Sequence, residues 1–279
     1  MKQLVLLGYP VDHSLSPLMH NAALKEMGLD DIYLYETQST LVNELQSKVD
    51  AIREGSIEGA NVTIPYKTEI MNYLDGISKE ATDAGSVNTL RRVKGEVIGY
   101  NTDVSGFLTS LRENSVLPLG LRVIILGAGG AAKAISYALV KSGIVRLDIR
   151  NRTLTRAADL ATKMRTHGAC EVRIFKDKAE LDFQETDLVV NCTPLGMNGK
   201  HIDESPIKSD VLHSELVVVD LVYNPRRTKL LMDAEQAGCR TIDGTGMLVN
   251  QGADALELWI GMRPPIDVMR EAVLHALGG

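Results

Sequence analysis

The segment Leu121–Ala132, LRVIILGAGGAA, constrains the fold of this chain more than any other stretch. An apolar run of strand length, 123–126, leads directly into three glycines within 127–130, and a helical pattern starts at Ala131. Strand, glycine turn and helix in this order form the context in which a G-x-G-x-x-A motif binds a dinucleotide. Such a turn lets the backbone approach a pyrophosphate, whose charge is favoured by the unpaired N–H groups at the helix start. A plain βα turn without a ligand is the alternative, and the sequence favours the nucleotide site.

The composition of the chain excludes several classes of protein. Its 279 residues are enough for two domains, and a net charge of −6 with only 4% aromatic residues argues against a nucleic-acid surface. No apolar run reaches the ~20 residues of a membrane span, and no signal-peptide pattern precedes the first strand. We therefore expect a cytoplasmic protein that binds small molecules, without nucleic-acid or membrane partners, as a monomer or homodimer.

The cysteines and histidines give no sign of a metal site or a disulfide framework. The three cysteines are widely spaced, and neither C-x-x-C nor H-E-x-x-H occurs. The six histidines form no ligand pair on one helix face. We expect all of them on the surface or in loops: His13, His20, His167, His201, His213 and His275.

Hydrophobic patterns predict strands that alternate with helices, which indicates an α/β protein with mainly parallel sheets and ligands at the carboxyl ends of the strands. In the first half, the predicted strands are 2–8, 32–36, 57–64, 86–92 and 96–100, and the predicted helices are 17–27, 41–52 and 104–111. In the second half, the predicted strands are 123–126, 144–149, 187–192, 215–222 and 240–243, and the predicted helices are 131–140, 227–237, 247–260 and 267–277.

Four side chains in the first half are candidates for binding an anionic substrate and moving a proton. Ser14 and Ser16 place two hydroxyls before a helix N-terminus, where a small carboxylate binds well, although Ser16 before Pro17 also fits an ordinary N-cap. Lys67 follows a strand end and could donate a proton to a ligand, with a solvated surface charge as the alternative. Asp103 fits the N-cap of the helix that follows it. Taken one at a time, these signals favour the structural roles.

The strand that follows the G-x-G-x-x-A motif and its helix ends in Asn151-Arg152-Thr153, and Arg156 lies one helical turn further on. At this position NAD-binding chains place an acidic residue that holds the ribose hydroxyls. Asp148 lies earlier, inside the strand pattern, and its side chain would face the wrong way. Because two guanidinium groups suit a 2′-phosphate, the sequence favours NADP over NAD, with exposed helix arginines as the alternative.

Taken together, the motifs resemble shikimate dehydrogenase over essentially the whole chain. Their order and spacing are more specific than any one of them. They are Ser14–Pro17 (SLSP), Asn61–Lys67 (NVTIPYK), Ala84–Thr89 (AGSVNT), Asn101–Asp103 (NTD), Gly127–Ala132 (GAGGAA), Asn151–Thr153 (NRT) with Arg156, and Gly244–Gln251 (GTGMLVNQ).

The resemblance implies reversible, NADPH-dependent reduction of 3-dehydroshikimate to shikimate, on the route to chorismate and the aromatic amino acids. It implies a substrate domain at 1–104 that is completed by 244–279. A Rossmann NADP-binding domain at 105–243 would be inserted between them, with the site in the intervening cleft.

The resemblance also implies a role for individual residues. Lys67 and Asp103 would form the catalytic pair. The substrate carboxylate would be held by Ser14, Ser16 and Tyr223, and the substrate hydroxyls by Thr63, Asn88, Asp103 and Gln251. The cofactor pyrophosphate would lie on Gly127, Ala128, Gly129, Gly130 and Ala131, and its 2′-phosphate on Asn151, Arg152, Thr153 and Arg156. The nicotinamide side would be lined by Leu221, Gly244 and Met247.

Two alternatives stay open at this point. The nearer one is a quinate/shikimate dehydrogenase that uses NAD, although the serine pair and the two arginines favour the NADP-using branch. The other is a non-catalytic relative that only binds a nucleotide, and the presence of both Lys67 and Asp103 argues against it.

Overall fold

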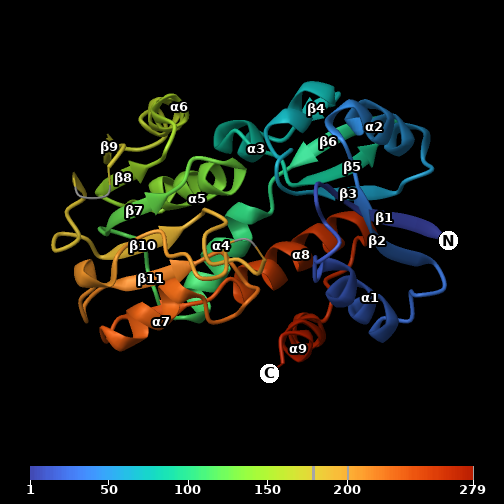
Figure 1. Ribbon diagram of the computed structural model, residues 1–279. Coiled ribbons are helices and arrows are strands. Elements are labelled where there is room, and N and C mark those ends of the chain that lie inside the picture. Colours follow the sequence, from blue (N-terminus) through green and yellow to red (C-terminus); the bar gives the residue numbers. More distant parts are fainter. Residues whose placement is uncertain (178–179, 200, 279) are drawn as a thin grey trace. The chain divides into compact units, whose positions relative to one another are not determined.

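The computed structural model describes residues 1–177, 180–199 and 201–278. The chain divides into two compact units, each with its own six-stranded sheet (Figure 1). Unit 1 combines Met1–Phe107 with Leu248–Gly279, and unit 2 is the continuous segment Leu108–Met247. Residues from the two ends of the chain therefore complete one unit, and the middle of the chain forms the other.

The sheet of unit 1 is mixed, with the strand order β2-β1-β3-β5-β6-β4. β1 is parallel to β2 and β3, whereas β5 is antiparallel to both β3 and β6. Lys94 and Gly95 between β5 and β6 both have positive φ, 53° and 90°. Two-residue hairpin turns prefer this backbone conformation, because it matches the twist of the flanking strands. The strands are β1 (Lys2–Gly8), β2 (Tyr33–Ser39), β3 (Gly59–Val62), β4 (Gly76–Ile77), β5 (Thr89–Val93) and β6 (Glu96–Tyr100).

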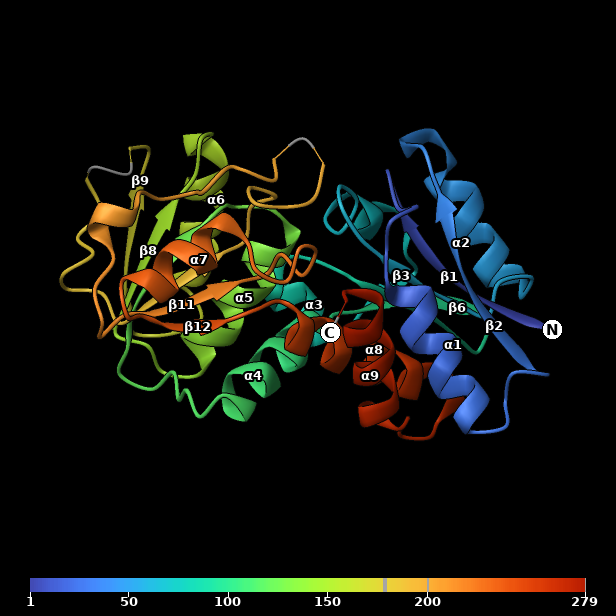
Figure 2. The same cartoon turned by 60° about the horizontal axis from the view of Figure 1, so that its bottom comes forward.

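The helices around this sheet come from both ends of the chain. Figure 2 shows the red C-terminal helices beside the blue helix α1. Two helices, α4 and α8, contain the points at which the chain leaves unit 1 and returns to it. The helical elements are α1 (Ser16–Glu26), η1 (Val42–Glu44), α2 (Leu45–Glu54), η2 (Glu69–Tyr73), α3 (Lys79–Ala84), α4 (Asp103–Glu113), α8 (Thr245–Ile260) and α9 (Ile266–Ala276).

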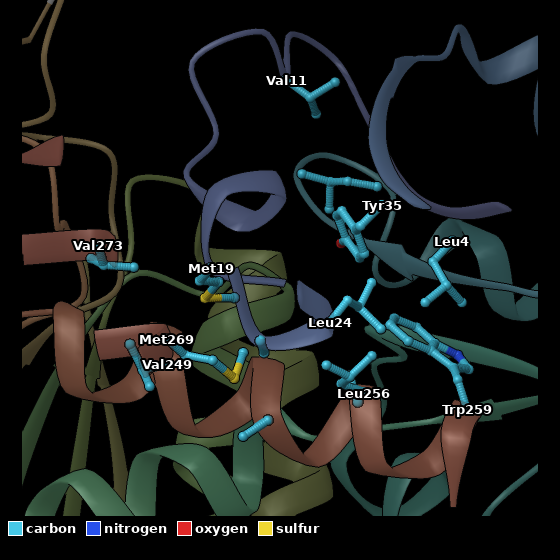
Figure 3. Packing of buried hydrophobic residues seen from close by; sticks show 14 residues of the cluster. Leu4, Val11, Met19, Leu24, Tyr35, Val249, Leu256, Trp259, Met269 and Val273 are labelled. Carbon is cyan, nitrogen blue, oxygen red and sulfur yellow. The ribbon is translucent and has the colours of Figure 1, made fainter. Parts of the chain in front are cut away.

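The alternating side chains of β1 supply two hydrophobic clusters, one on each face of the sheet. Leu4 and Leu6 pack with α1, α8 and α9 on one face (Figure 3). Val5 and Leu7 pack on the other face with residues that include those of α2. A strand that is buried on both faces has apolar residues at successive positions, and this pattern makes β1 predictable from the sequence.

The sheet of unit 2 is parallel throughout, with the order β12-β11-β10-β7-β8-β9. The strand order reverses between β7 and β10, the type of position at which α/β sheets bind ligands. The strands are β7 (Arg122–Leu126), β8 (Arg146–Arg150), β9 (Glu171–Phe175), β10 (Leu188–Asn191), β11 (Val217–Asp220) and β12 (Arg240–Ile242). The helices are α5 (Gly130–Lys141), α6 (Leu154–Met164), η4 (Ser209–Val211) and α7 (Lys229–Gln236).

The predicted fold class, α/β with mainly parallel sheets, is confirmed. Two differences concern edge strands, which tolerate polar residues because one side of the ladder has no neighbour. The strand β9 was not predicted, because charged residues interrupt its pattern and Val172 is its one buried residue. β2 extends to Ser39, beyond the predicted end at Glu36, because the polar Thr37–Ser39 still pairs with β1. Within the described ranges, no helix is long and apolar enough to cross a membrane.

Candidate active site

The centre of the candidate site in unit 1 is an ion pair between Lys67 and Asp103. Lys67 lies on the loop after β3, and Asp103 is the first residue of α4. The lysine Nζ donates to Asp103 Oδ2 at 2.7 Å, and the two side chains are only 14% and 2% exposed. A surface position for Lys67 is therefore excluded. A shielded ammonium held by a carboxylate is a suitable group for delivering a proton to a ligand.

The Asp103 carboxylate can reach Lys67 because another residue caps α4. Asn101 Oδ1 accepts hydrogen bonds from the backbone N–H groups of Asp103 at 3.0 Å and Val104 at 3.3 Å. The Asn101 amide is itself fixed by donating to the carbonyl oxygen of Ser86 at 2.8 Å. The expectation that Asp103 is the N-cap is thus wrong, since its carboxylate takes no part in closing the helix start.

Asn88 and Gln251 complete a hydrogen-bonded group around this pair. Asn88 Nδ2 donates to Asp103 Oδ1 at 3.0 Å and to Gln251 Oε1 at 3.2 Å. Gln251 comes from α8, which approaches α4 closely at Gly106, where an added Cβ would lie 2.7 Å from the Gln251 backbone nitrogen. The glycine therefore allows residues more than a hundred positions apart to meet.

The two serines lie together at the start of α1, but not as predicted. The N-cap position is Leu15, so Ser16 already belongs to the helix and the assignment of Ser16 as N-cap is wrong by one residue. The Ser14 hydroxyl oxygen accepts from the Ser16 backbone N–H at 3.2 Å, and its own proton points to Ser16 Oγ at 3.2 Å. Thr63 is half-buried on the loop that carries Lys67, and its backbone N–H donates to the Leu7 carbonyl at 2.9 Å.

In unit 2, the glycine turn between β7 and α5 has the geometry of an anion cradle. Gly127 has φ +115°, and a Cβ there would lie 3.2 Å from the Cys192 carbonyl oxygen. Gly129 is the N-cap of α5, no described atom lies within 4 Å of where its Cβ would be, and no described side chain caps the helix. Open space before uncapped N–H groups suits a pyrophosphate. Ala128 is buried and Ala131 half-buried along this turn.

The side chains after β8 fit a 2′-phosphate and leave no acid for a ribose. Arg152, Thr153 and Arg156 are exposed, and Asn151 Nδ2 donates to the Thr153 carbonyl at 2.8 Å, which shapes the turn. Asp148 is fully buried, with Arg173 donating to both of its oxygens at 2.7 and 2.6 Å. The nearest acid on this strand is therefore neutralised within the protein.

A further cation adds to the positive charge beside this turn. Lys133 lies in the first turns of α5 and is half-buried. Burial lowers the pKa of Lys133, and the neighbouring charges of Lys163 and Arg156 lower it further, against the opposing effect of Asp159. The charges around Arg156 thus favour an anion.

The residues expected on the nicotinamide side come from the loop after β11, which carries Leu221, and from the start of α8, where Gly244 and Met247 lie. Gly244 lies against Leu221, because a Cβ on the glycine would be 2.4 Å from the Leu221 carbonyl oxygen. Met247 is buried, and Leu221 and Tyr223 are half-buried. Tyr223 belongs to unit 2, whereas the other side chains expected to bind substrate belong to unit 1.

Asp220, which precedes this loop, was missed by the sequence analysis. Its Oδ1 accepts from Asn191 Nδ2 at 2.9 Å and from the Val222 N–H at 3.0 Å, and its Oδ2 from the Thr228 hydroxyl at 2.7 Å. Burial raises the pKa of Asp220 to about 6. The signal available in the sequence was an acidic residue at the end of an apolar strand, a position that usually faces a ligand site.

His20 is a correction to the expectation that all histidines lie on the surface or in loops. Its side chain is fully buried on α1, and its ring stacks on Tyr35 with 4.1 Å between ring centroids. Neither ring nitrogen has a hydrogen-bond partner among the described residues. Burial lowers the pKa of His20 to about 3.

Three family models match the chain. They are described as the shikimate dehydrogenase substrate binding domain over residues 6–90, shikimate/quinate 5-dehydrogenase over 114–244, and the shikimate 5′-dehydrogenase C-terminal domain over 244–274. The chain belongs to the shikimate dehydrogenase family.

Individual members of the shikimate dehydrogenase family match along the full length. The NADP⁺-dependent shikimate dehydrogenase of Methanopyrus kandleri is 44% identical over 276 residues, which cover 98% of this chain and 94% of that protein. A crystal structure of a shikimate dehydrogenase with NADP⁺ superimposes with a TM-score of 0.91 at 38% identity, covering 99% and 96% of the two chains. The Thermus thermophilus enzyme with NADP(H) and shikimate gives a TM-score of 0.87 at 35% identity, covering 99% and 100%.

Proposed function

We propose that this chain catalyses the reversible, NADPH-dependent reduction of 3-dehydroshikimate to shikimate. The observation that carries the proposal is the shielded Lys67–Asp103 pair, joined to Asn88 and Gln251, in a member of the shikimate dehydrogenase family. A family member that only bound a nucleotide would have no need for this buried arrangement of an ammonium and a carboxylate, which is costly to build unless its bonds are satisfied.

Lys67 would act on the substrate oxygen whose charge changes during the reaction. The nicotinamide of bound NADPH supplies the hydride that reduces the ring carbonyl. As negative charge develops on the carbonyl oxygen, the Lys67 ammonium stabilises it and donates a proton. Asp103 holds the lysine in place through the 2.7 Å bond and accepts from a neighbouring substrate hydroxyl. In the reverse direction, Lys67 would take the proton from the shikimate hydroxyl.

The substrate would be held by polar groups of unit 1 with one contribution from unit 2. Ser14 and Ser16 would donate to the carboxylate from the start of α1, where the helix dipole also favours an anion. Tyr223 would assist them. The substrate hydroxyls would be held by Thr63, Asn88, Asp103 and Gln251. We accordingly propose unit 1 as the substrate domain and unit 2 as the NADP domain.

NADP would be held by backbone and side-chain groups of unit 2. The backbone over Gly127–Ala131 would hold the pyrophosphate at the uncapped start of α5. Asn151, Arg152, Thr153 and Arg156 would hold the 2′-phosphate. Leu221, Gly244 and Met247 would line the nicotinamide side. We further propose that the protein works in the cytoplasm, as a monomer or homodimer.

The test is the loss of NADPH absorbance with 3-dehydroshikimate, repeated with NADH in place of NADPH. Oxidation of quinate is measured in the reverse direction, because one matching family model covers both shikimate and quinate enzymes. We expect turnover with 3-dehydroshikimate and NADPH, and much slower reaction with NADH or quinate. Efficient oxidation of quinate with NAD would mean that the chain is a quinate/shikimate dehydrogenase. No turnover with any combination of substrate and cofactor would mean that the chain only binds a nucleotide.

A further inference from the structure

The orientation of the Asn88 side-chain amide is fixed from its oxygen end. Asn88 Oδ1 accepts from the Thr102 backbone N–H at 2.7 Å, and an N–H group can only donate. The amide NH₂ must therefore face Asp103 Oδ1, at 3.0 Å. Rotation of the amide by half a turn would bring its oxygen against the Asp103 carboxylate, and two acceptors would then repel each other.

Two hydroxyls reach the oxygen end of this amide, that of Thr102 at 3.3 Å and the closer one of Thr89. Thr89 is fully buried, and its hydroxyl donates to Asn88 Oδ1 at 3.0 Å. Its competing contact with the Thr102 hydroxyl is longer, at 3.4 Å. Since a hydroxyl has a single proton, that proton is free for Asn88 only if the neighbouring side chain on the other side of Thr89 is a donor and not a second acceptor.

Asn61 is that donor, and the Asn88 backbone carbonyl sets the direction of the Asn61 amide. Asn61 Nδ2 donates to Thr89 Oγ1 at 3.0 Å and also to the Asn88 backbone carbonyl at 3.1 Å, which can only accept. The oxygen of the Asn61 amide must then point the other way, where the Tyr35 hydroxyl donates to it at 2.8 Å. The direction of every bond from Tyr35 to Asp103 is thereby determined.

The chain of bonds begins in the apolar cluster of unit 1. The ring of Tyr35 is 1% exposed and packs among the side chains shown in Figure 3. Burying its hydroxyl, the Asn61 amide and the Thr89 hydroxyl costs free energy unless each is bonded. These groups satisfy one another in a single series that ends at the carboxylate of the Lys67–Asp103 pair.

We propose that Thr89 is a positioning residue for the reaction. Its hydroxyl, oriented by Asn61 and Tyr35, holds the Asn88 amide so that the NH₂ group faces Asp103 and the substrate. Among the described residues, the Thr89 hydroxyl has hydrogen-bond contacts with Asn61, Asn88 and Thr102, and of these only Asn88 is expected to touch the substrate. The proposal rests on the proposed function, because the readout of positioning is turnover of shikimate.

The first test compares Thr89→Val, which keeps the shape and removes the hydroxyl, with Thr89→Ser, which keeps the hydroxyl. We expect Thr89→Val to lower kcat for shikimate oxidation about fivefold to tenfold, the effect of one buried hydrogen bond. Thr89→Ser should stay within about twofold of the wild type, and the KM for NADP should be unchanged in both. Thr40→Val is the matched control, because Thr40 is also fully buried in unit 1 and its hydroxyl donates to the Gln38 carbonyl at 2.7 Å. It should lose stability without losing kcat.

A double-mutant cycle with Asn88→Ala separates positioning from general destabilisation. If Thr89 acts through Asn88, adding Thr89→Val to Asn88→Ala should change kcat by less than about twofold. Losses that multiply across the two substitutions would overturn the proposal, as would equal kcat for Thr89→Val and Thr89→Ser.

Solvent exchange of the Asn88 side-chain amide protons, followed by NMR, gives a readout that needs no turnover. We expect faster exchange in Thr89→Val than in the wild type and Thr89→Ser. If the Asn88 amide protons exchanged faster in Thr89→Val, but the wild type did not turn over shikimate, the proposed function would be rejected. The support of Asn88 by Thr89 would still stand. Unchanged exchange in an active protein would reject the role of Thr89.

Discussion

Removing the buried imidazole of His20 should change how the stability of unit 1 depends on pH. In the folded protein His20 stays neutral, because burial lowers its pKa to about 3, whereas in the unfolded chain it titrates near its ordinary value of 6.5. The unfolded state therefore binds a proton that the folded state does not over this range. Stability is retained above pH 6.5 and is lost as pH falls from 6.5 towards 3.

The expected size of the effect follows from these two values. Stability falls by about 1.4 kcal/mol for each pH unit below the pKa of the unfolded chain, so His20 should cost about 2 kcal/mol between pH 7.5 and pH 5. His20→Phe keeps an aromatic ring against Tyr35 and removes the titration. Any constant packing penalty of the larger ring cancels when the same protein is compared at two pH values.

Urea unfolding followed by tryptophan fluorescence measures this difference directly. The chain has one tryptophan, Trp259, whose ring centroid lies 5.9 Å from that of His20 in the same core. Between pH 7.5 and 5 the wild type should lose about 2 kcal/mol more than His20→Phe. His13→Phe, which replaces an exposed histidine, is the control and should follow the wild type. If the free energy of unfolding of the wild type and of His20→Phe changed with pH by the same amount, to within about 0.5 kcal/mol, the reasoning would be refuted. The His20 ring would then have a partner that stabilises its charged form in the folded state.

Three further predictions concern the site. Lys67→Ala should lower turnover at least ~10²-fold with unchanged NADPH affinity by fluorescence titration, and near-normal turnover would mean that Lys67 is not the proton donor. Arg152→Ala should weaken NADPH use roughly 10- to 150-fold in kcat/KM, the value of a charge-assisted bond of about 1.5–3 kcal/mol, and less at high salt; an equal loss with NADH would contradict a 2′-phosphate contact. Burial raises the pKa of Asp220 from 3.8 to about 6, so the folded state holds this proton longer, and about 3 kcal/mol of stability should be lost as pH rises from about 4 to 6. Asp220→Asn should remove that dependence in urea unfolding, and an unchanged pH dependence would show that Asp220 is ionised throughout.

Local sequence patterns predicted most of the fold because its main signals are short-range. The apolar run of β7, the glycine turn at Gly127 and the helix after it depend only on neighbouring residues and on one backbone angle. The hairpin turn at Lys94-Gly95 is similar. The edge strand β9 was missed because an edge position relaxes the hydrophobic pattern on which the prediction depends.

The parts of the site that could not be predicted depend on contacts between distant segments. Asp103 reads as a helix cap from its neighbours, and only the position of Asn101 frees its carboxylate for Lys67. His20 lies on α1, which packs against α8 and α9 from the C-terminal part of the chain. The residues next to His20 in the sequence therefore give no sign that its side chain is buried. The family motifs brought Lys67 and Asp103 together as a hypothesis, but they could not indicate that the Thr89 hydroxyl supports Asn88.

The two-ended construction of unit 1 determines when its core can form during synthesis. Leu4 and Leu6 are covered in part by α8 and α9, which are made long after them. Until those helices leave the ribosome, only α1 is available to cover that face of the β1 sheet, while unit 2 is a continuous segment that is made before most of α8. The nascent chain thus carries a partly uncovered apolar surface until α8 and α9 are made, and a chain that stops after Met247 would keep that surface exposed to aggregation.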